Sequence, residues 1–191
     1  MKIHTLLSLA CDLCDQPADY TAKQIIFPNS RVAFLYPSKE DWAENKLSLE
    51  SHNICAYTDG LANELGVGAG VFVESTIEDQ AAFLNSDQEQ SVSLSKTTTI
   101  FQAEMLALST ALTILNSCVN TSIALITESM SAMQSLQNPA VRTKTKLSCI
   151  NQINSVPQLN QLALIWVPGH SGIHGHEKAD EMANIGAALE T

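Results

Sequence analysis

Four acidic residues and one histidine stand where their chemistry could matter: Asp59, Glu104, Glu128, Asp180 and His170. Asp59 and Glu128 each follow a short apolar run that is typical of a strand. Ligands of open α/β sheets bind at the carboxyl ends of central strands, so both acids are expected at one edge if the strands are parallel neighbours. Taken alone, either acid is explained as well by the start of a turn.

Glu104 lies inside the apolar stripe of a predicted helix. It comes three residues after Phe101 and four before Leu108, which is the spacing of one helical face. A carboxylate on a core-facing stripe is costly unless it is paired or bound to a metal ion. The alternative is a glutamate that is rotated out to solvent.

Asp180 is expected in the first turn of a helix that begins at Glu177, where the helix dipole alone favours an acid. His170 lies in the Pro/Gly loop before this helix, and a lone loop histidine is usually a surface residue. Together, however, four acids from separate elements cannot all stay ionised without cations. Their oxygen atoms suit Mg²⁺ or Mn²⁺. Two such ions about 4 Å apart can activate a water and stabilise the leaving oxygen in phosphodiester cleavage.

The composition describes one folded domain in a chain of 191 residues. A net charge of −10 argues against a protein that coats nucleic acid nonspecifically, because such a protein would be basic. A nuclease remains possible if its basic residues are placed locally or metal ions screen its acids. Arg142, Lys144 and Lys146 are candidates for gripping a DNA strand, and the alternative is a solvated helix face.

Five cysteines, an odd number, favour reduced thiols in an intracellular protein over a disulfide framework. Cys11 and Cys14 form a lone C-x-x-C, and a zinc site shared with His174 and His176 is a weaker alternative. No apolar run approaches the roughly 20 residues of a membrane span, so no membrane partner is expected.

The order of the elements predicts a mixed-sheet α/β domain over residues 51–191, preceded by an irregular leader or connector, residues 1–50, that drapes over it. Strands are expected over residues 54–58, 66–73, 91–94, 123–126 and 162–167. Helices are expected over residues 101–115, 129–137, 138–153 and 177–189.

Five segments resemble the ordered motifs of a type 1 ribonuclease H domain, in the form found at the end of non-LTR retrotransposon polyproteins. They are residues 57–60 (YTDG), 101–104 (FQAE), 126–129 (ITES), 166–172 (WVPGHSG) and 177–180 (EKAD). The resemblance covers residues 53–189. It implies a mixed five-stranded sheet flanked by helices and endonucleolytic hydrolysis of the RNA strand of an RNA–DNA hybrid.

The resemblance also implies a site with two Mg²⁺ ions, for which Mn²⁺ can substitute. Asp59, Glu104, Glu128 and Asp180 would be the ligands, with Asp59 between the ions and Glu104 near the ribose 2′-hydroxyl that distinguishes RNA from DNA. His170 would assist proton transfer or product release. Residues 1–50 would join the domain to a reverse transcriptase module in a longer polyprotein, in the cytoplasm or nucleus.

The chain departs from the family pattern around this site. The third acid is usually aspartate and here is Glu128, whose extra methylene moves the carboxylate by about 1.5 Å. A misplacement of about 1 Å can cost on the order of a hundredfold in rate, so activity is expected to be reduced. Met130, Leu61 and His176 also differ from the residues that are usual there, the last replacing asparagine. The alternative is a catalytically impaired module, derived from a retroelement, that binds hybrids or contacts protein.

Overall fold

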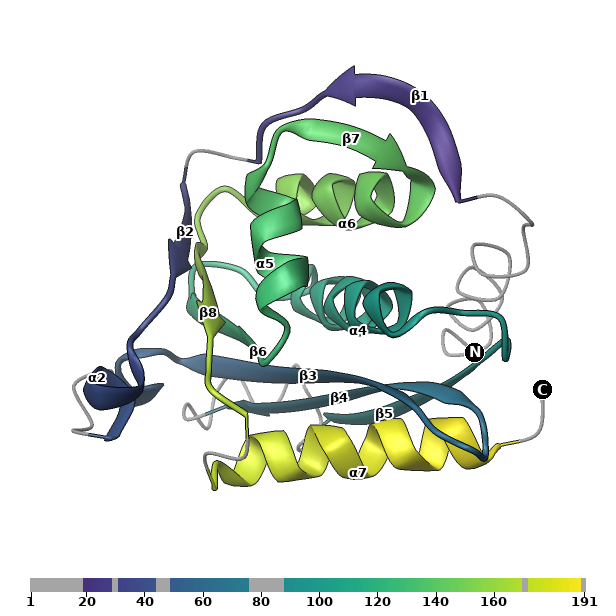
Figure 1. Ribbon diagram of the computed structural model, residues 1–191. Coiled ribbons are helices and arrows are strands. Elements are labelled where there is room, and N and C mark those ends of the chain that lie inside the picture. Colours follow the sequence, from purple (N-terminus) through teal and green to yellow (C-terminus); the bar gives the residue numbers. More distant parts are fainter. Residues whose placement is uncertain (1–18, 29–30, 44–48, 76–87, 170–171, 190–191) are drawn as a thin grey trace.

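The structure is a computed structural model that describes residues 19–28, 31–43, 49–75, 88–169 and 172–189. These residues form a six-stranded mixed sheet with helices on both faces, and a separate two-stranded sheet (Figure 1). The predicted mixed α/β architecture is confirmed. The predicted number of five strands is too low, because the segment before residue 50 adds a strand to the edge of the main sheet.

The six strands of the main sheet follow a spatial order that differs from their order in the chain. They are β2 (Val32–Leu35), β8 (Gln161–Trp166), β6 (Ser122–Thr127), β3 (Ile54–Ala62), β4 (Val67–Ser75) and β5 (Gln88–Leu94). The first four are parallel, and β4 and β5 are antiparallel to their neighbours. The central strands β6 and β8 are almost wholly buried, as expected for short apolar runs that are covered on both faces.

Helices cover the two faces of the sheet unequally (Figure 1). One face carries α4 (Ile100–Leu115), α5 (Met130–Gln137) and α6 (Lys144–Ser155), and the other carries α7 (His174–Ala188). Two short helices, α2 (Lys39–Ala43) and η1 (Leu49–Ser51), precede β3. The larger core lies under α4, α5 and α6, and a smaller one lies under α7. No helix among the described residues combines the length and apolar character that a bilayer span requires.

The predicted helix over residues 138–153 is wrong in its first part. Asn138 ends α5, with its backbone N–H donating to Gln134, and its side-chain Oδ1 accepts from the Ala140 N–H at 2.9 Å. The chain then forms β7 (Ala140–Thr143), which pairs antiparallel with β1 (Tyr20–Ile25). Helix α6 begins only at Lys144, and Asn-Pro here ends one helix without starting another.

The described part of the leader is built into the fold. Strand β1 pairs with β7, which lies on the outer side of α6 (Figure 1). Strand β2 pairs with β8 and adds an edge strand to the main sheet. Val32 and Phe34 of β2 are half-buried and pack against the larger core. The leader therefore contributes ordered strands as well as connecting segments.

Candidate active site

Two of the predicted site acids leave the sheet at the same edge. Strands β3 and β6 are parallel neighbours, and their last paired residues are Thr58 and Thr127. Asp59 lies one residue beyond this pair in β3, and Glu128 is the first residue after β6. The condition for this placement, that the two strands are parallel neighbours, is met. Asp59 is itself part of β3, which continues to Ala62 against β4 alone.

Gly60 lets Glu104 lie close to Asp59. A Cβ at Gly60 would overlap the backbone of Ala103 and Glu104, so only glycine lets α4 approach β3 at this point. Glu104 is 8% exposed, and its carboxylate accepts a hydrogen bond from the Gly60 backbone. The prediction that Glu104 faces the interior is confirmed, and the solvent-facing alternative is wrong.

A second glycine brings α7 close to Asp59. Gly70 of β4 lies opposite Asp59 in the β3–β4 ladder, and a Cβ there would overlap the carbonyl oxygen of Ala179. Asp180 follows Ala179 directly and is exposed. Its Oδ1 accepts a hydrogen bond from Asn184 Nδ2 at 3.2 Å.

The start of α7 corrects the prediction for Asp180. The helix begins at His174 and not at Glu177, so Asp180 lies in its second turn. The attraction of an acid to a helix N-terminus falls off within the first turn. The helix dipole therefore gives no sufficient reason for an acid at this position.

The acids repel one another electrostatically. Burial raises the pKa of Asp59 to about 6, with further contributions from the charges of Asp180 and Glu128. Burial also raises the pKa of Glu104 to about 8, with contributions from Asp59 and Glu128. The Gly60 backbone opposes both shifts by hydrogen-bonding the ionised carboxylates. The four acids thus form one group of like charges that is costly to ionise without cations.

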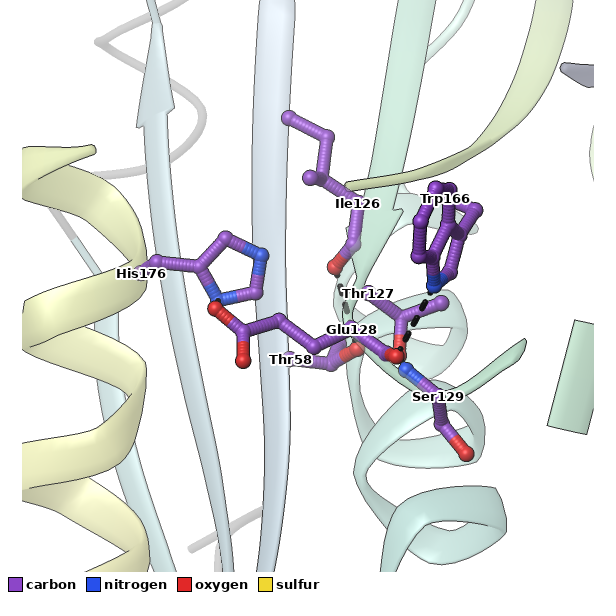
Figure 2. A network of polar contacts seen from close by, with 7 residues as sticks. All are labelled: Thr58, Ile126, Thr127, Glu128, Ser129, Trp166 and His176. Atoms are coloured by element: carbon purple, nitrogen blue, oxygen red, sulfur yellow. Dashed lines mark hydrogen bonds and ion pairs between the residues drawn. The ribbon is translucent and has the colours of Figure 1, made fainter. Parts of the chain in front are cut away.

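Backbone contacts fix the position of Glu128 (Figure 2). The indole Nε1–H of Trp166 donates to the Glu128 carbonyl at 3.0 Å, and the Ser129 N–H donates to Thr127 Oγ1 at 3.1 Å. Ser129 then caps α5 by accepting from the Ala132 N–H. The backbone at Glu128 is therefore fixed by β8 on one side and by the start of α5 on the other.

The side chain of Glu128 extends toward α7 (Figure 2). Its Oε1 lies 3.8 Å from His176 Nδ1, and a Cβ at Gly169 would come within 3.0 Å of its Oε2. His176 is only 6% exposed, and its ring meets that of Tyr57 edge-on at 5.8 Å. The sequence identified His176 only as a departure from asparagine and as a ligand of the alternative zinc site, because nothing in the chain shows that it reaches Glu128.

An open cleft of about 230 Å³ lies over these residues. Its lining consists of three of the acids together with the loop and first turns of α7: Asp59, Glu128, Gly172, Ile173, His176, Glu177 and Asp180. Glu104 is absent from this lining, which agrees with its burial behind Asp59. The cleft gives a substrate access to the acids from the side of α7.

The donors present fit a hard divalent cation. They are carboxylate oxygens, and Glu104 Oε2 is buried without a hydrogen-bond partner among the described residues. Within the same residues, no three Asp, Glu, His or Cys side chains lie close enough to hold a metal ion as they stand. Metal binding at this cleft would therefore require a change in the side-chain conformations of these acids.

Other predicted residues lie apart from the cleft or outside the described part. His170, Cys11 and Cys14 fall outside the described residues. His174 is exposed on α7, with its ring edge-on to Phe72 at 6.1 Å. The zinc alternative therefore has no described cysteine pair to support it.

The predicted basic grip is wrong for Lys146. This lysine is 5% exposed, and its Nζ donates to the carbonyls of Asn138 and Ala140 at 2.7 and 2.9 Å. It ties α6 to the chain that enters β7, which is a structural role. Arg142 is exposed on β7, which lies on the side of the sheet opposite α7 (Figure 1).

Comparison with known proteins agrees with this architecture. No curated protein matches the chain. A family model described as RNase H matches residues 51–188, a segment that holds all four acids, the cleft and every strand of the main sheet except β2. Because the match covers well over half of the 191 residues, the chain belongs to the RNase H family.

Proposed function

We propose that this protein hydrolyses the RNA strand of RNA–DNA hybrids at the cleft between β3, β6 and α7. Membership of the RNase H family supports hybrid nuclease activity in general. The observation that carries the proposal for this chain is the group of four acids. Burial raises the pKa of Asp59 to about 6 and that of Glu104 to about 8, and repulsion by neighbouring carboxylates adds to both shifts. Such a cluster suits a reaction that brings divalent cations to a phosphodiester.

Divalent metal ions are general in this family, and Asp59, Glu104, Glu128 and Asp180 would hold them here. Two Mg²⁺ ions, or Mn²⁺ in their place, would supply an activated water and stabilisation of the leaving oxygen. The fold positions the acids, because Gly60 and Gly70 let the backbones of α4 and α7 pack closely against the sheet. Glu104, the most buried of them, would be the acid near the ribose 2′-hydroxyl of the RNA strand.

His170 would complete the site from the loop before α7. An imidazole near the cleft can carry a proton to the leaving group or hasten product release. The support for this role is the sequence motif around His170.

The rate is expected to be below that of a site with aspartate at position 128. Glu128 is one methylene longer, and its side chain extends toward His176. Its carboxylate is consequently displaced by about 1.5 Å from where an aspartate would hold it. A change of this size is enough to slow turnover while leaving the charge for metal binding in place.

A fluorogenic RNA–DNA hybrid in Mg²⁺ and in Mn²⁺ tests this function. We expect the wild-type protein to cut the RNA strand, and Asp59→Asn to lower the rate by a hundredfold or more, because it removes the charge at the centre of the cluster. Cleavage by the wild type that does not exceed that of Asp59→Asn would refute the nuclease function. Salt-dependent binding of the hybrid without cleavage would instead indicate an impaired binding module.

The biological setting is part of the same proposal. The motifs favour a module of a retroelement polyprotein that acts beside a reverse transcriptase. The buried free thiols of Cys55, Cys118 and Cys149 favour an intracellular location. Sequencing the natural transcript tests this setting. An open reading frame that continues upstream into polymerase motifs would support it, and in-frame stop codons directly upstream would contradict it.

A further inference from the structure

His176 is a buried polar residue that faces the cleft acid Glu128. The imidazole is 6% exposed, and its Nδ1 lies 3.8 Å from Glu128 Oε1 (Figure 2). Its ring packs edge-on against Tyr57 with an interplanar angle of 74°. The preceding residue, Gly175, also lies against Tyr57, since a Cβ there would overlap the tyrosine ring. Packing therefore holds the imidazole in place on one side of the carboxylate.

The two ring nitrogens of His176 have different surroundings. A neutral imidazole carries one N–H, either on Nδ1 or on Nε2. Nε2 is buried and has no hydrogen-bond partner among the described residues. A proton on Nε2 would be a buried donor without an acceptor, whereas a proton on Nδ1 faces a carboxylate oxygen. The surroundings favour the Nδ1–H tautomer.

We infer that His176 is a positioning residue whose Nδ1–H holds the long side chain of Glu128 in one orientation toward the cleft. The observed 3.8 Å exceeds the roughly 3.2 Å limit of a hydrogen bond, so the inference requires a small rotation of the Glu128 side chain toward Nδ1. The importance of this contact for catalysis rests on the proposed function.

Three substitutions separate a donor at Nδ1 from mere packing. His176→Leu keeps an apolar side chain of similar size without a donor. His176→Asn places an amide where Nδ1 stands, and His176→Gln places it where Nε2 stands. We expect a roughly tenfold loss of Mn²⁺ affinity and of kcat for the leucine and glutamine variants, with asparagine within about threefold of the wild type. Packing alone predicts the reverse order, with leucine tolerated best.

A double-mutant cycle with Glu128→Asp tests whether the effect passes through Glu128. The shorter carboxylate ends farther from Nδ1, so His176→Leu should change Mn²⁺ affinity by less than about threefold in that background. Glu128→Asp itself should raise kcat, because the family geometry returns. His174→Leu, on the exposed side of the same turn, serves as the control that leaves both quantities unchanged. An equal loss from His176→Leu in both backgrounds would overturn the inference.

Nitrogen NMR of the imidazole decides the contact without metal or substrate. The wild type should show His176 as the Nδ1–H tautomer, and Glu128→Leu should shift its ring nitrogens by removing the acceptor. An Nε2–H tautomer in the wild type, or ring shifts that are indifferent to Glu128→Leu, would overturn the inference. Failure of the proposed function differs from failure of this inference. If the proposed function fails, the wild type neither binds Mn²⁺ nor cleaves the hybrid, whereas the NMR result requires neither metal nor substrate.

Discussion

At the scale of single residues, burial and mutual repulsion disfavour the ionised forms of Asp59 and Glu104. Glu104 illustrates this best, because it combines burial with the nearby charges of Asp59 and Glu128. Its position on an apolar helical stripe could be predicted from the spacing of Phe101 and Leu108. The contact between Glu128 and His176 could not be predicted, since it depends on the placement of α7 beside the end of β6.

The sign of the Glu104 effect on stability follows from its pKa. The folded protein raises this pKa from 4.5 to about 8, so it retains a proton that the unfolded chain releases. The resulting contribution to stability is fully present below the unfolded pKa and is lost as the pH rises through about 8. Asp59, with a pKa raised to about 6, acts in the same direction.

We therefore predict that the metal-free protein loses at least about 1 kcal/mol of unfolding free energy between about pH 5.5 and pH 8, and that Glu104→Gln removes much of this loss. Urea unfolding in the presence of a chelator measures both. Glu64→Gln, at an exposed position, is the control and should keep the slope of the wild type. Stability of the wild type that stays flat over this range would show that the crowding is weaker than the structure implies.

At the scale of elements, two glycines let the acid-bearing helices approach the sheet beside Asp59. At Gly60, the backbone of α4 packs directly against β3 beside Asp59. At Gly70, which pairs with Asp59 in the β3–β4 ladder, the backbone of α7 packs directly against β4. At each of these glycines, helix backbone occupies the space that a side chain would fill. An acid of that helix therefore lies close to Asp59. The geometry of the site thus depends on backbone contacts as much as on the acids themselves.

Gly70→Ala should destabilise the protein by about 2 kcal/mol or more, because its Cβ would overlap the Ala179 carbonyl and push α7 outward. It should also weaken Mn²⁺ binding, since Asp180 moves with the helix. Gly172→Ala is the contrasting variant. It meets no atom within 4 Å but has a φ of 69°, so strain alone should cost about 1 kcal/mol. Equal unfolding midpoints for the two variants would refute the claim that Gly70 is needed for the close packing of α7 on β4.

The elements also show where prediction from sequence ends. The central strands β6 and β8 and the long helix α4 were predictable to within one or two residues, because their apolar patterns are local and continuous. The short strands β1, β2 and β7 were not, because each depends on a partner far away in the chain. The helix start predicted at Asn138-Pro139 was wrong for the same reason, since the strand that forms there pairs with β1.

At the scale of the whole molecule, the fold gathers acids at one place in a chain that is already strongly acidic. The net charge of −10 disfavours a polyanionic hybrid unless cations intervene. The family match begins at residue 51, so β1 and β2 precede it, with β1 paired to β7 and β2 paired to β8. We propose residues 51–191 as the domain, with the leader strands as an addition to it.

The central claim is that four carboxylates from separate elements form one divalent-cation site. The most direct test is an anomalous difference map from a crystal soaked in Mn²⁺. We predict peaks between Asp59, Glu104, Glu128 and Asp180, with the carboxylates of Glu104 and Glu128 rotated toward them. A map without a peak at this cleft, in which the four side chains keep their separate orientations, would contradict the account.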